Sequence, residues 1–411
     1  MFSFAVSICL AISATALLLH ALGAWATRKH TADRHAPAVP LPPLTLLKPI
    51  KGLEEELELN LRSFFAQDYP GALQFIFCST EPGDPGIELA RQVAAEYPRW
   101  RVDFVLSDPD FGYNPKVSNL AGALSSAEHD LVLQSDANVR IRPGYLKAVV
   151  QEFLQQRAGL LGSLVVGSRE RSLGAALENV QLTTFITPGI CLAYEVFKIP
   201  CVIGKSILFR RSELNELGGL AAVKDVLAED YLLGELYTRA GKRVVLSRFV
   251  VDNINVTASL RRFVARHSRW LKMRAVVHAV GFAADLLSNA SFFALLAAVL
   301  SGGERQLWIG YLLVVLYKGF VDARLLEHLR GEKLSRAHLL SLPLRDLILP
   351  GLWVHALFSR STEWRGERFH LTRGSKLIPL GSASSITAYE LSALGPSSSP
   401  TPARPPAEHQ G

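Results

Sequence analysis

The chain has 411 residues, enough for more than one domain. Apolar residues make up 49% of it and the mean hydropathy is +0.20, which is high for a soluble protein and favours contact with a membrane. The net charge of +7 suits anionic lipid or an anionic small substrate, whereas no zinc-finger, RNP or basic-zipper pattern supports binding to nucleic acid. The four cysteines lie far apart without a CxxC pair, which disfavours a thiolate metal centre and favours a reducing compartment.

The N-terminal stretch predicts a membrane anchor. Residues 1–27 contain no Asp, Glu, Lys or Arg, and crossing a bilayer core needs about 20 apolar residues. A cleaved signal peptide is the alternative, but it normally has basic residues before a shorter apolar core, and the first basic residue here is Arg28. The basic run that follows predicts a transmembrane signal anchor with the downstream chain in the cytoplasm. Residues 28–43, which end in APAVPLPP, are expected to form an extended linker.

Residues 44–275 alternate short apolar runs with amphipathic stretches. The runs LTLLKPI, LQFIFCS, RVDFVLS and HDLVLQSD have the length of strands, and the stretches between them have helical spacing. This alternation predicts an α/β domain whose mostly parallel sheet is covered by helices on both faces. Ligands of such sheets bind beyond the carboxyl ends of the strands, so polar residues directly after strands are site candidates. No GxGxxG motif follows the first strand and no GxxxxGKS motif occurs, which argues against a dinucleotide or P-loop site.

Acidic residues at two places in the chain are candidates for metal binding or catalysis at the carboxyl ends of the strands. Asp136 closes the run LVLQSD with Asn138 two residues later, and such oxygen ligands suit Mg²⁺ or Mn²⁺, which bridge diphosphate oxygens. The alternative is an Asx turn before the next helix. In LAEDY, Glu229 and Asp230 begin a stretch with helical spacing. Acids there complement the helix dipole, and a carboxylate at that place can also take a proton from an attacking hydroxyl.

The motif RHSRW lies just before a second apolar region. Arg266 and Arg269 are three residues apart, so a helix places them on one face, where two guanidiniums suit a diphosphate leaving group. Trp270 lies on a neighbouring face and can pack on the domain or at a lipid interface. The alternative is a basic interfacial helix beside a membrane, and the two interpretations are compatible.

Residues 276–359 are expected to be C-terminal membrane segments. Apolar stretches occur at about 276–302, 306–326 and 338–358, and each carries ionisable residues. Charges are costly at membrane depth, so these residues are expected to face protein, the interface or a water-filled groove.

Pro343 and Pro350 are expected to break the third stretch, which predicts two crossings plus a re-entrant or third segment. The sequence 360–381 is rich in Arg and Lys and is therefore expected in the cytoplasm. Residues 382–411 consist largely of Ser, Pro and Ala and are expected to form a disordered tail.

In their order along the chain, these motifs resemble inverting glycosyltransferases of the family 2/21 type. Within that type the resemblance is to the ceramide glucosyltransferase-like group, with hopanoid-associated glycosyltransferases as near relatives. It runs from the anchor to about residue 375 and is carried by LLKPIKG (46–52), NLRSFFAQDYP (60–70), NPKVSNL (114–120), LGAALENV (173–180), LFRRSELNELGGL (208–220), AEDY and RxxRW. Processive polysaccharide synthases typically have Gln as the first residue of the last motif.

The resemblance implies a GT-A fold, a Rossmann-like nucleotide-sugar transferase domain that uses a UDP-sugar and a divalent metal. It implies that Asp230 is the base and that Asp136 and Asn138 hold Mg²⁺ or Mn²⁺, although many relatives have a second acid in place of Asn138. The donor-binding residues that it implies are Lys48, Pro49, Glu81, Lys116, Arg266, Arg269 and Trp270.

Besides Asn138, two further positions depart from the family pattern. Glu81 stands where the family usually has an Asp that binds uracil, with Asp84 nearby. Thr187 stands where animal ceramide enzymes have a His before a Pro, which bears on the acceptor more than on the reaction type.

The implied reaction moves a sugar, with glucose favoured, from UDP to the hydroxyl of a membrane lipid by a single inverting displacement. Ceramide is the first expected acceptor, and a hopanoid or diacylglycerol, with N-acetylglucosamine as a second sugar, is the alternative. A processive polysaccharide synthase is disfavoured because two or three C-terminal segments are few for a polymer channel. A non-enzymatic membrane scaffold is disfavoured because Asp136 and Asp230 are both present. The expected setting is a bacterial inner membrane, with the catalytic domain in the cytoplasm.

Overall fold

A mixed sheet of eight strands forms the centre of the larger domain. The computed structural model describes residues 3–32, 39–335, 338–364 and 367–380. The strands are β1 Leu44–Pro49, β2 Leu73–Ser79, β3 Arg101–Leu106, β4 Leu131–Ser135, β5 Val139–Arg140, β6 Leu160–Ser168, β7 Ser206–Arg210 and β8 Val244–Ile254. Their order is β3-β2-β1-β4-β7-β6-β8-β5, and β7 runs antiparallel to both of its neighbours. The predicted α/β class with a mostly parallel sheet is confirmed.

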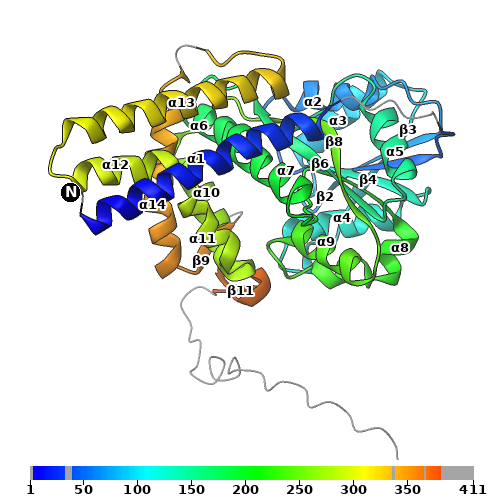
Figure 1. The fold of residues 1–411 in the computed structure, drawn as a ribbon. Helices are drawn as coiled ribbons and strands as arrows, with labels where there is room; N and C mark the ends of the chain where they lie inside the picture. The colour runs from blue at the N-terminus through cyan, green and yellow to red at the C-terminus, as the bar shows by residue number, and fades with distance from the viewer. Residues whose placement is uncertain (1–2, 33–38, 336–337, 365–366, 381–411) are drawn as a thin grey trace, which may run out of the picture.

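Helices cover both faces of this sheet (Figure 1). They are α2 Leu57–Phe65, α3 Pro85–Ala95, α4 Pro115–Ser125, α5 Tyr145–Gln155, α6 Leu173–Gln181, α7 Thr187–Glu195, α8 Arg211–Glu216 and α9 Glu229–Arg239. Successive side chains of a strand point to opposite faces. In β2, Phe75 and Phe77 therefore pack with α2, α3 and α5, while Ile76 and Cys78 pack with α4 and α9. Helices thus cover both faces of the central strands, which explains why those strands are continuous apolar runs in the sequence.

A layer of long helices lies beside the sheet domain, made by the two ends of the chain (Figure 1). It contains α1 Phe4–His30, α10 Leu260–Val277, α11 Ala279–Leu287, α12 Ala290–Leu300, α13 Arg305–Arg330 and α14 Ser341–Phe358. The N-terminal half of α1 packs on α12, and its C-terminal half packs on α7 of the sheet domain. The N-terminal helix therefore connects the two parts of the molecule.

Among the described helices, α1 alone is by itself long and apolar enough to cross a membrane, judged by length and composition. The pair α11 and α12, bent by 57°, forms a second candidate if the two count as one broken span. The expected crossings by the later segments stay a prediction.

The predicted break in the third C-terminal stretch is wrong, because α14 runs unbroken from Ser341 to Phe358. Pro343 lies in its first turn, where the missing N–H leaves no intrahelical bond unmade. Pro350 lies inside the helix and cannot donate to the carbonyl of Asp346 four residues earlier. The side chain of Asn289 donates to that carbonyl at 2.8 Å and so replaces the lost bond.

The basic sequence after α14 contains a small antiparallel sheet of β9 Ser361–Trp364, β10 Glu367–Leu371 and β11 Leu377–Pro379. The predicted disordered tail at 382–411 lies outside the described residues, as does part of the predicted linker, at 33–38.

A buried ionic network joins the helices of this layer. Lys318 and Asp322 of α13 pair with each other at 3.0 Å, and Arg345 and Asp346 of α14 pair at 2.8 Å. Cross-pairs of 3.0 and 3.1 Å link the two helices, and His20 of α1 lies 2.9 Å from Asp322. All four charged residues of α13 and α14 are less than 5% exposed. The expectation that these ionisable residues face protein is confirmed.

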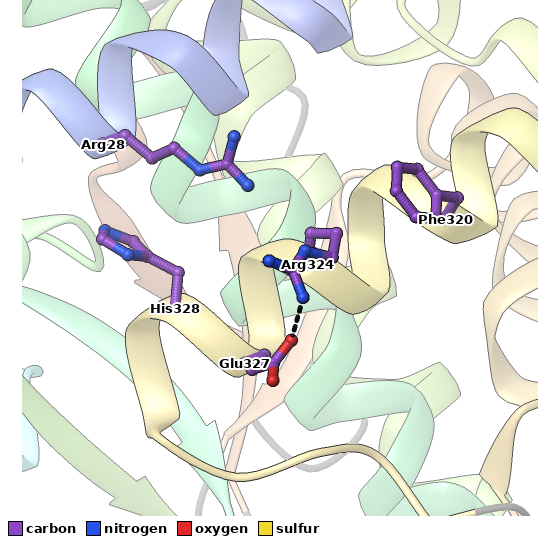
Figure 2. Close-up of a pocket in the computed structure, with 5 residues that line it drawn as sticks. All are labelled: Arg28, Phe320, Arg324, Glu327 and His328. Carbon is purple, nitrogen blue, oxygen red and sulfur yellow. Dashed lines mark hydrogen bonds and ion pairs between the residues drawn. The ribbon is translucent and has the colours of Figure 1, made fainter.

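Replacing Arg345 with Met should lower the free energy of unfolding by about 3–5 kcal/mol, because it leaves two buried carboxylates with too few cations. Chemical unfolding of the detergent-solubilised protein measures the change. Arg324→Met is the matched control, since Arg324 is exposed on α13 and pairs with Glu327 at the surface (Figure 2). Exposed ion pairs contribute little, so equal losses in the two variants would contradict this account.

Candidate active site

Asp136 and several other predicted site residues gather at the carboxyl end of β4. Asp136 follows this strand directly, and its backbone N–H donates to the Lys205 carbonyl at 3.1 Å, just before β7 begins. Because β7 runs antiparallel to β4, its first residues lie at the same edge of the sheet as Asp136. Asp136 thus lies at the carboxyl edge where the parallel-sheet rule predicts ligands to bind, and the antiparallel strand β7 brings Lys205 to the same edge.

Two lysines hold the carboxylate of Asp136. Lys116 Nζ lies 3.0 Å from one of its oxygens and Lys205 Nζ lies 3.0 Å from the other. Burial opposes ionisation, but these two cations outweigh it and hold the pKa of Asp136 far below its usual range. Lys205 also donates to the side-chain oxygen of Asn138 at 2.9 Å. Asp136 and Asn138 thus form one oxygen-rich group that is already neutralised by lysine.

The NPK sequence explains how Lys116 reaches this group. Asn114 caps α4, because its side-chain oxygen accepts from the backbone N–H groups of Lys116 and Val117. Pro115 occupies the first helical position, where no donor is needed. Lys116 then extends to the Gly204 carbonyl at 2.6 Å as well as to its acidic partners. Burial lowers the pKa of Lys116, but the acids around it outweigh burial and raise it above its ordinary value.

Asp230 lies in the first turn of α9, on the other side of Lys116. Its two carboxylate oxygens accept from the backbone N–H groups of Gly204 at 2.6 Å and Tyr231 at 2.8 Å. Burial and the neighbouring charge of Glu229 raise the pKa of Asp230 to about 6, although Lys116 acts in the opposite direction. Glu229 itself pairs with Lys116 at 3.0 Å. The structure therefore joins Asp136 and the LAEDY acids through one lysine.

Lys48 and Pro49 lie at the end of β1, next to β4. Lys48 is 1% exposed, and its Nζ donates to the Asp136 carbonyl at 3.0 Å while lying 3.7 Å from the centre of the Phe64 ring. Burial lowers the pKa of Lys48 to about 7, although Asp136 opposes the shift. Lys48 supports Asp136 from the interior in this structure, and the predicted nucleotide contact of Lys48 and Pro49 stays a prediction.

Glu81 and Asp84 lie in the loop after β2. Asp84 accepts from the backbone N–H groups of Gly52 and Gly86 and from the Ser79 hydroxyl, so its carboxylate fixes the loop. Glu81 has a half-exposed side chain and pairs with Lys51 at 2.8 Å. Glu81 is thus the acid that a ligand can reach, and its role with uracil stays a prediction.

The arginines of RHSRW, on α10, contact different neighbours. Arg266 donates to Glu178 of α6 at 2.9 Å, and His267 Nε2 lies 3.2 Å from the other oxygen of the same carboxylate. Burial opposes ionisation of Glu178, but these two partners hold its pKa down at about 2. The Arg269 guanidinium lies 6.0 Å from the Trp364 ring of β9, and Trp270 packs edge-on against His267. A joint clamp of both arginines on a diphosphate stays a prediction.

Three residues that contact the candidate site or the chain beside it were not predicted from the sequence. Lys205 lies two residues before the apolar run Ile207–Phe209, and this strand-like run is the signal that could have pointed to Lys205. Glu178 lies inside the LENV sequence that carried part of the resemblance. Ser375 has no such signal, because it belongs to the basic C-terminal segment.

Ser375 fixes the chain just before the Asp230 helix. Its carbonyl accepts from Leu227 N–H at 2.9 Å, and its hydroxyl accepts from Ala228 N–H at 3.0 Å. On the other side of this contact, the Asp225 carbonyl accepts from Leu377 N–H at 2.8 Å. The C-terminal segment therefore determines where α9 begins.

No group of three or more His, Cys, Asp or Glu side chains gathers as a metal centre within the described part of the chain. Asp136 and Asn138 nevertheless provide one carboxylate and one amide oxygen side by side, both shared with Lys205. Mg²⁺ is commonly held by one or two carboxylates and completes its shell with phosphate and water oxygens. The donor set fits a divalent cation of that kind.

A separate surface pocket between α1 and α13 contains none of the predicted site residues (Figure 2). It is lined by Arg28, Phe320, Arg324, Glu327 and His328. The site described above therefore does not extend to this face.

Replacing Ser375 with Ala should loosen the start of α9, because Ala228 N–H loses its side-chain acceptor. A hydrogen bond of this kind contributes about 1 kcal/mol, so amide exchange at 228–231 should quicken by roughly fivefold. Hydrogen exchange followed by mass spectrometry measures this. The exposed Ser212 to Ala change is a matched control and should leave these amides unaffected. Unchanged exchange in the Ser375 variant would show that the contact does not position α9.

Comparison with known proteins agrees with the resemblance seen in the motifs. The model of glycosyl transferase family 21 matches residues 6–377. Ceramide glucosyltransferase 3 of Caenorhabditis elegans is 27% identical over 347 residues, which cover 82% of this chain and 75% of that protein. Ceramide glucosyltransferase of Komagataella phaffii is 30% identical over 296 residues, which cover 57% of this chain and 58% of that protein.

Among solved structures, the mannosyltransferase PcManGT from Pyrobaculum calidifontis in complex with GDP-Man and Mn²⁺ is 17% identical, with a TM-score of 0.48 over 86% of this chain and 98% of that one. The family match covers nearly the whole chain up to β11. The chain therefore belongs to glycosyl transferase family 21 and is a glycosyltransferase, an enzyme that moves a sugar from a nucleotide-sugar donor to an acceptor.

Proposed function

We propose that this glycosyltransferase moves a sugar, glucose first, from a UDP-sugar to the hydroxyl of a membrane lipid, ceramide first, with inversion at the anomeric carbon. The observation that carries the proposal is the placement of Asp230. Its carboxylate is fixed by two backbone N–H groups, its pKa is raised to about 6, and one lysine separates it from the Asp136 group. The names of the relatives support glucose and ceramide over other pairs.

Asp230 acts as the base in this proposal. A carboxylate whose pKa lies near 6 is ionised at neutral pH and still basic enough to take the proton of an attacking hydroxyl as the new bond forms. Such general-base help contributes typically about 10²–10⁴-fold. The hydrogen bonds from Gly204 and Tyr231 orient the carboxylate, so little reorganisation is needed when the acceptor arrives.

The charge on the departing UDP is stabilised at the Asp136 end of the site. When bound, Mg²⁺ or Mn²⁺ would be held by Asp136 and Asn138 and would neutralise diphosphate charge. Lys116 and Lys205 bring two further cations to the same place, and both are positioned before any donor arrives. Arg266, Arg269 and Trp270 are proposed to bind the diphosphate from α10, while Glu81 is proposed to bind the uracil.

The helical layer supports a lipid acceptor. Large apolar side chains are exposed along one helix of this layer, α13: Trp308, Ile309, Leu312, Leu313, Leu316 and Phe320. Together with the apolar α1, this surface suits burial in a bilayer. In this proposal residues 1–27 anchor the chain, 44–275 form the catalytic domain on the cytoplasmic side, and 276–359 contact the bilayer of a bacterial inner membrane.

Thr187, the position that bears on the acceptor, differs from the His of animal ceramide enzymes. Thr187 is buried and donates its hydroxyl hydrogen bond to the Val165 carbonyl at 2.6 Å, so it has a packing role. Hopanoid and diacylglycerol acceptors, and N-acetylglucosamine as the sugar, are therefore kept as alternatives in the test.

The test uses the full-length protein in purified membranes, with radiolabelled UDP-glucose or UDP-N-acetylglucosamine and Mg²⁺ or Mn²⁺. Ceramide, diacylglycerol and a hopanoid polyol are supplied separately. We expect labelled glycosyl ceramide from the wild type. Label in another lipid alone would overturn the ceramide assignment, and label in no lipid would overturn the proposed function.

Asp230→Asn should lower transfer by at least about 10²-fold while UDP binding stays intact, because the amide keeps the shape but cannot take a proton. Initial rates and calorimetric titration with UDP measure the two properties. Asp225→Asn is a matched control five residues before Asp230, and it should keep most of the activity. Near-normal transfer by the Asp230 variant would show that another group is the base.

The transfer rate at low donor concentration should fall roughly tenfold per pH unit below pH 6 and level off above it. The rate falls toward acid pH because Asp230, with its raised pKa, is protonated below about pH 6 and cannot then act as a base. The charged groups that face Asp230 are Glu229 and Lys116, so Glu229→Gln should move the acid limb to lower pH. A limb that does not move in this variant would assign the titration to another group.

A further inference from the structure

The surface pocket between α1 and α13 has a volume of about 390 Å³, a size found among small-ligand sites. Arg28 extends toward it from α1, while Phe320, Arg324, Glu327 and His328 come from α13 (Figure 2). None of these residues has a part in the proposed transfer. The pocket is therefore a candidate for a second ligand, and its charges indicate which kind.

Positive charge is in excess at this pocket. Among the described residues that line it, Glu327 is the only acid, and one of its oxygens lies 2.5 Å from Arg324 Nη1. Lys333, just beyond the end of α13, lies 4.0 Å from the other oxygen. Arg28 is exposed and makes no ion pair within the described ranges of the chain. Three cations thus face one carboxylate, and guanidinium groups suit the oxygens of a phosphate.

Two side-chain contacts hold α1 and α13 side by side and pointing the same way. His20 of α1 lies 2.9 Å from Asp322 of α13, and further along Thr31 Oγ1 lies 2.9 Å from His328 Nε2. Residue numbers therefore rise in the same direction along both helices, and their C-terminal ends reach the same surface. In the proposed topology this surface is cytoplasmic, where anionic lipids attract Lys and Arg.

The pocket continues an apolar stripe on α13. Ile309, Leu313, Leu316 and Phe320 are exposed, and their spacing of three or four residues places them on one face. Arg324 follows Phe320 at the same spacing. Phe320 thus ends the apolar stripe and also lines the basic pocket. This face changes from apolar to basic within about one turn, as a phospholipid changes from acyl chain to phosphate.

The same change occurs on α1. Leu18, Leu22 and Trp25 are exposed, and Arg28 follows Trp25 by three residues. Tryptophan is enriched at the level of lipid head groups, which places Arg28 at that level too. A free anion such as inorganic phosphate would contact the cations alone and gain nothing from the two apolar stripes. The surface therefore favours a lipid as the occupant.

We propose that this pocket binds the phosphate head of an anionic phospholipid, such as phosphatidylglycerol, whose acyl chains lie along the exposed stripes of α1 and α13. Arg28 and Arg324 hold the phosphate oxygens, while the contact between Thr31 and His328 keeps the two helix ends together. The inference rests on the proposed contact of these helices with a bilayer and does not depend on the sugar or the acceptor.

A lipid held here is linked to the catalytic domain through the end of α13. Arg330 pairs with Glu170, which follows β6, at 2.9 Å. The Leu329 carbonyl accepts from Arg142 of the sheet domain at 2.7 Å. Because these contacts fix the pocket relative to the sheet domain, the bound lipid ties that domain to the membrane surface.

The test titrates the full-length protein in detergent with short-chain phosphatidylglycerol and measures the apparent Kd by native mass spectrometry. Replacing both Arg28 and Arg324 with Gln should raise this Kd by about 25-fold, because each basic residue near a membrane surface contributes about fivefold. The matched control replaces Arg239 and Arg305 with Gln. It removes the same charge from an exposed ion pair on α9 and from the opposite end of α13, and it should leave the Kd unchanged.

Glu327→Gln should act in the opposite direction and lower the apparent Kd by about fivefold, a gain that a misfolded variant would not show. Phosphatidylcholine should bind more weakly than phosphatidylglycerol, and inorganic phosphate at the concentration of the lipid should not displace it. Equal Kd values for the two lipids, displacement by inorganic phosphate, or equal effects of the two double variants would overturn the proposal. These measurements involve no sugar transfer, so a wild type that binds phosphatidylglycerol but transfers no sugar would overturn the proposed function alone.

Discussion

One buried ammonium group connects the parts of the site. Lys116 lies between Asp136 at the end of β4 and Glu229 at the start of α9, and it also donates to the Gly204 carbonyl. Each of these groups comes from a different part of the chain, and each would be a costly buried charge or dipole without the lysine. The Gly204 N–H then donates to Asp230, so this contact positions the carboxylate that is proposed as the base.

Three cations near the carboxyl edge of the sheet have acidic partners. Lys116 and Lys205 hold Asp136, while Arg266 holds Glu178. This pairing keeps long, flexible side chains in one geometry before a nucleotide sugar binds. An enzyme gains most from charges that are already oriented, because little energy is then spent on turning them during the reaction. Asp136 and Glu178 therefore act within the structure as holders of these cations.

The helical layer makes distant contacts that local patterns do not show. Pro350 stays inside α14 because Asn289, from another helix, donates to the free carbonyl of Asp346. That unbroken helix carries Trp353, whose ring stacks on Phe282 of α11. The C-terminal segment acts similarly on the other side, where Ser375 holds the residues that precede α9. The ends of the chain thus shape a site whose chemistry lies in the middle.

The sequence by itself determined the first four strands, the helices between them and the place of Asp136 after the fourth, because alternating apolar runs are local signals with a fixed geometric consequence. It also determined the family, through short motifs such as NPK and AEDY. Only the tertiary structure decided that Lys205 faces Asp136 and that Arg266 and Arg269 contact different neighbours. It alone decided the contact between Ala228 and Ser375, which are 147 residues apart. Such contacts depend on how separate helices and strands pack together, and this packing cannot be inferred from the spacing of residues along the chain.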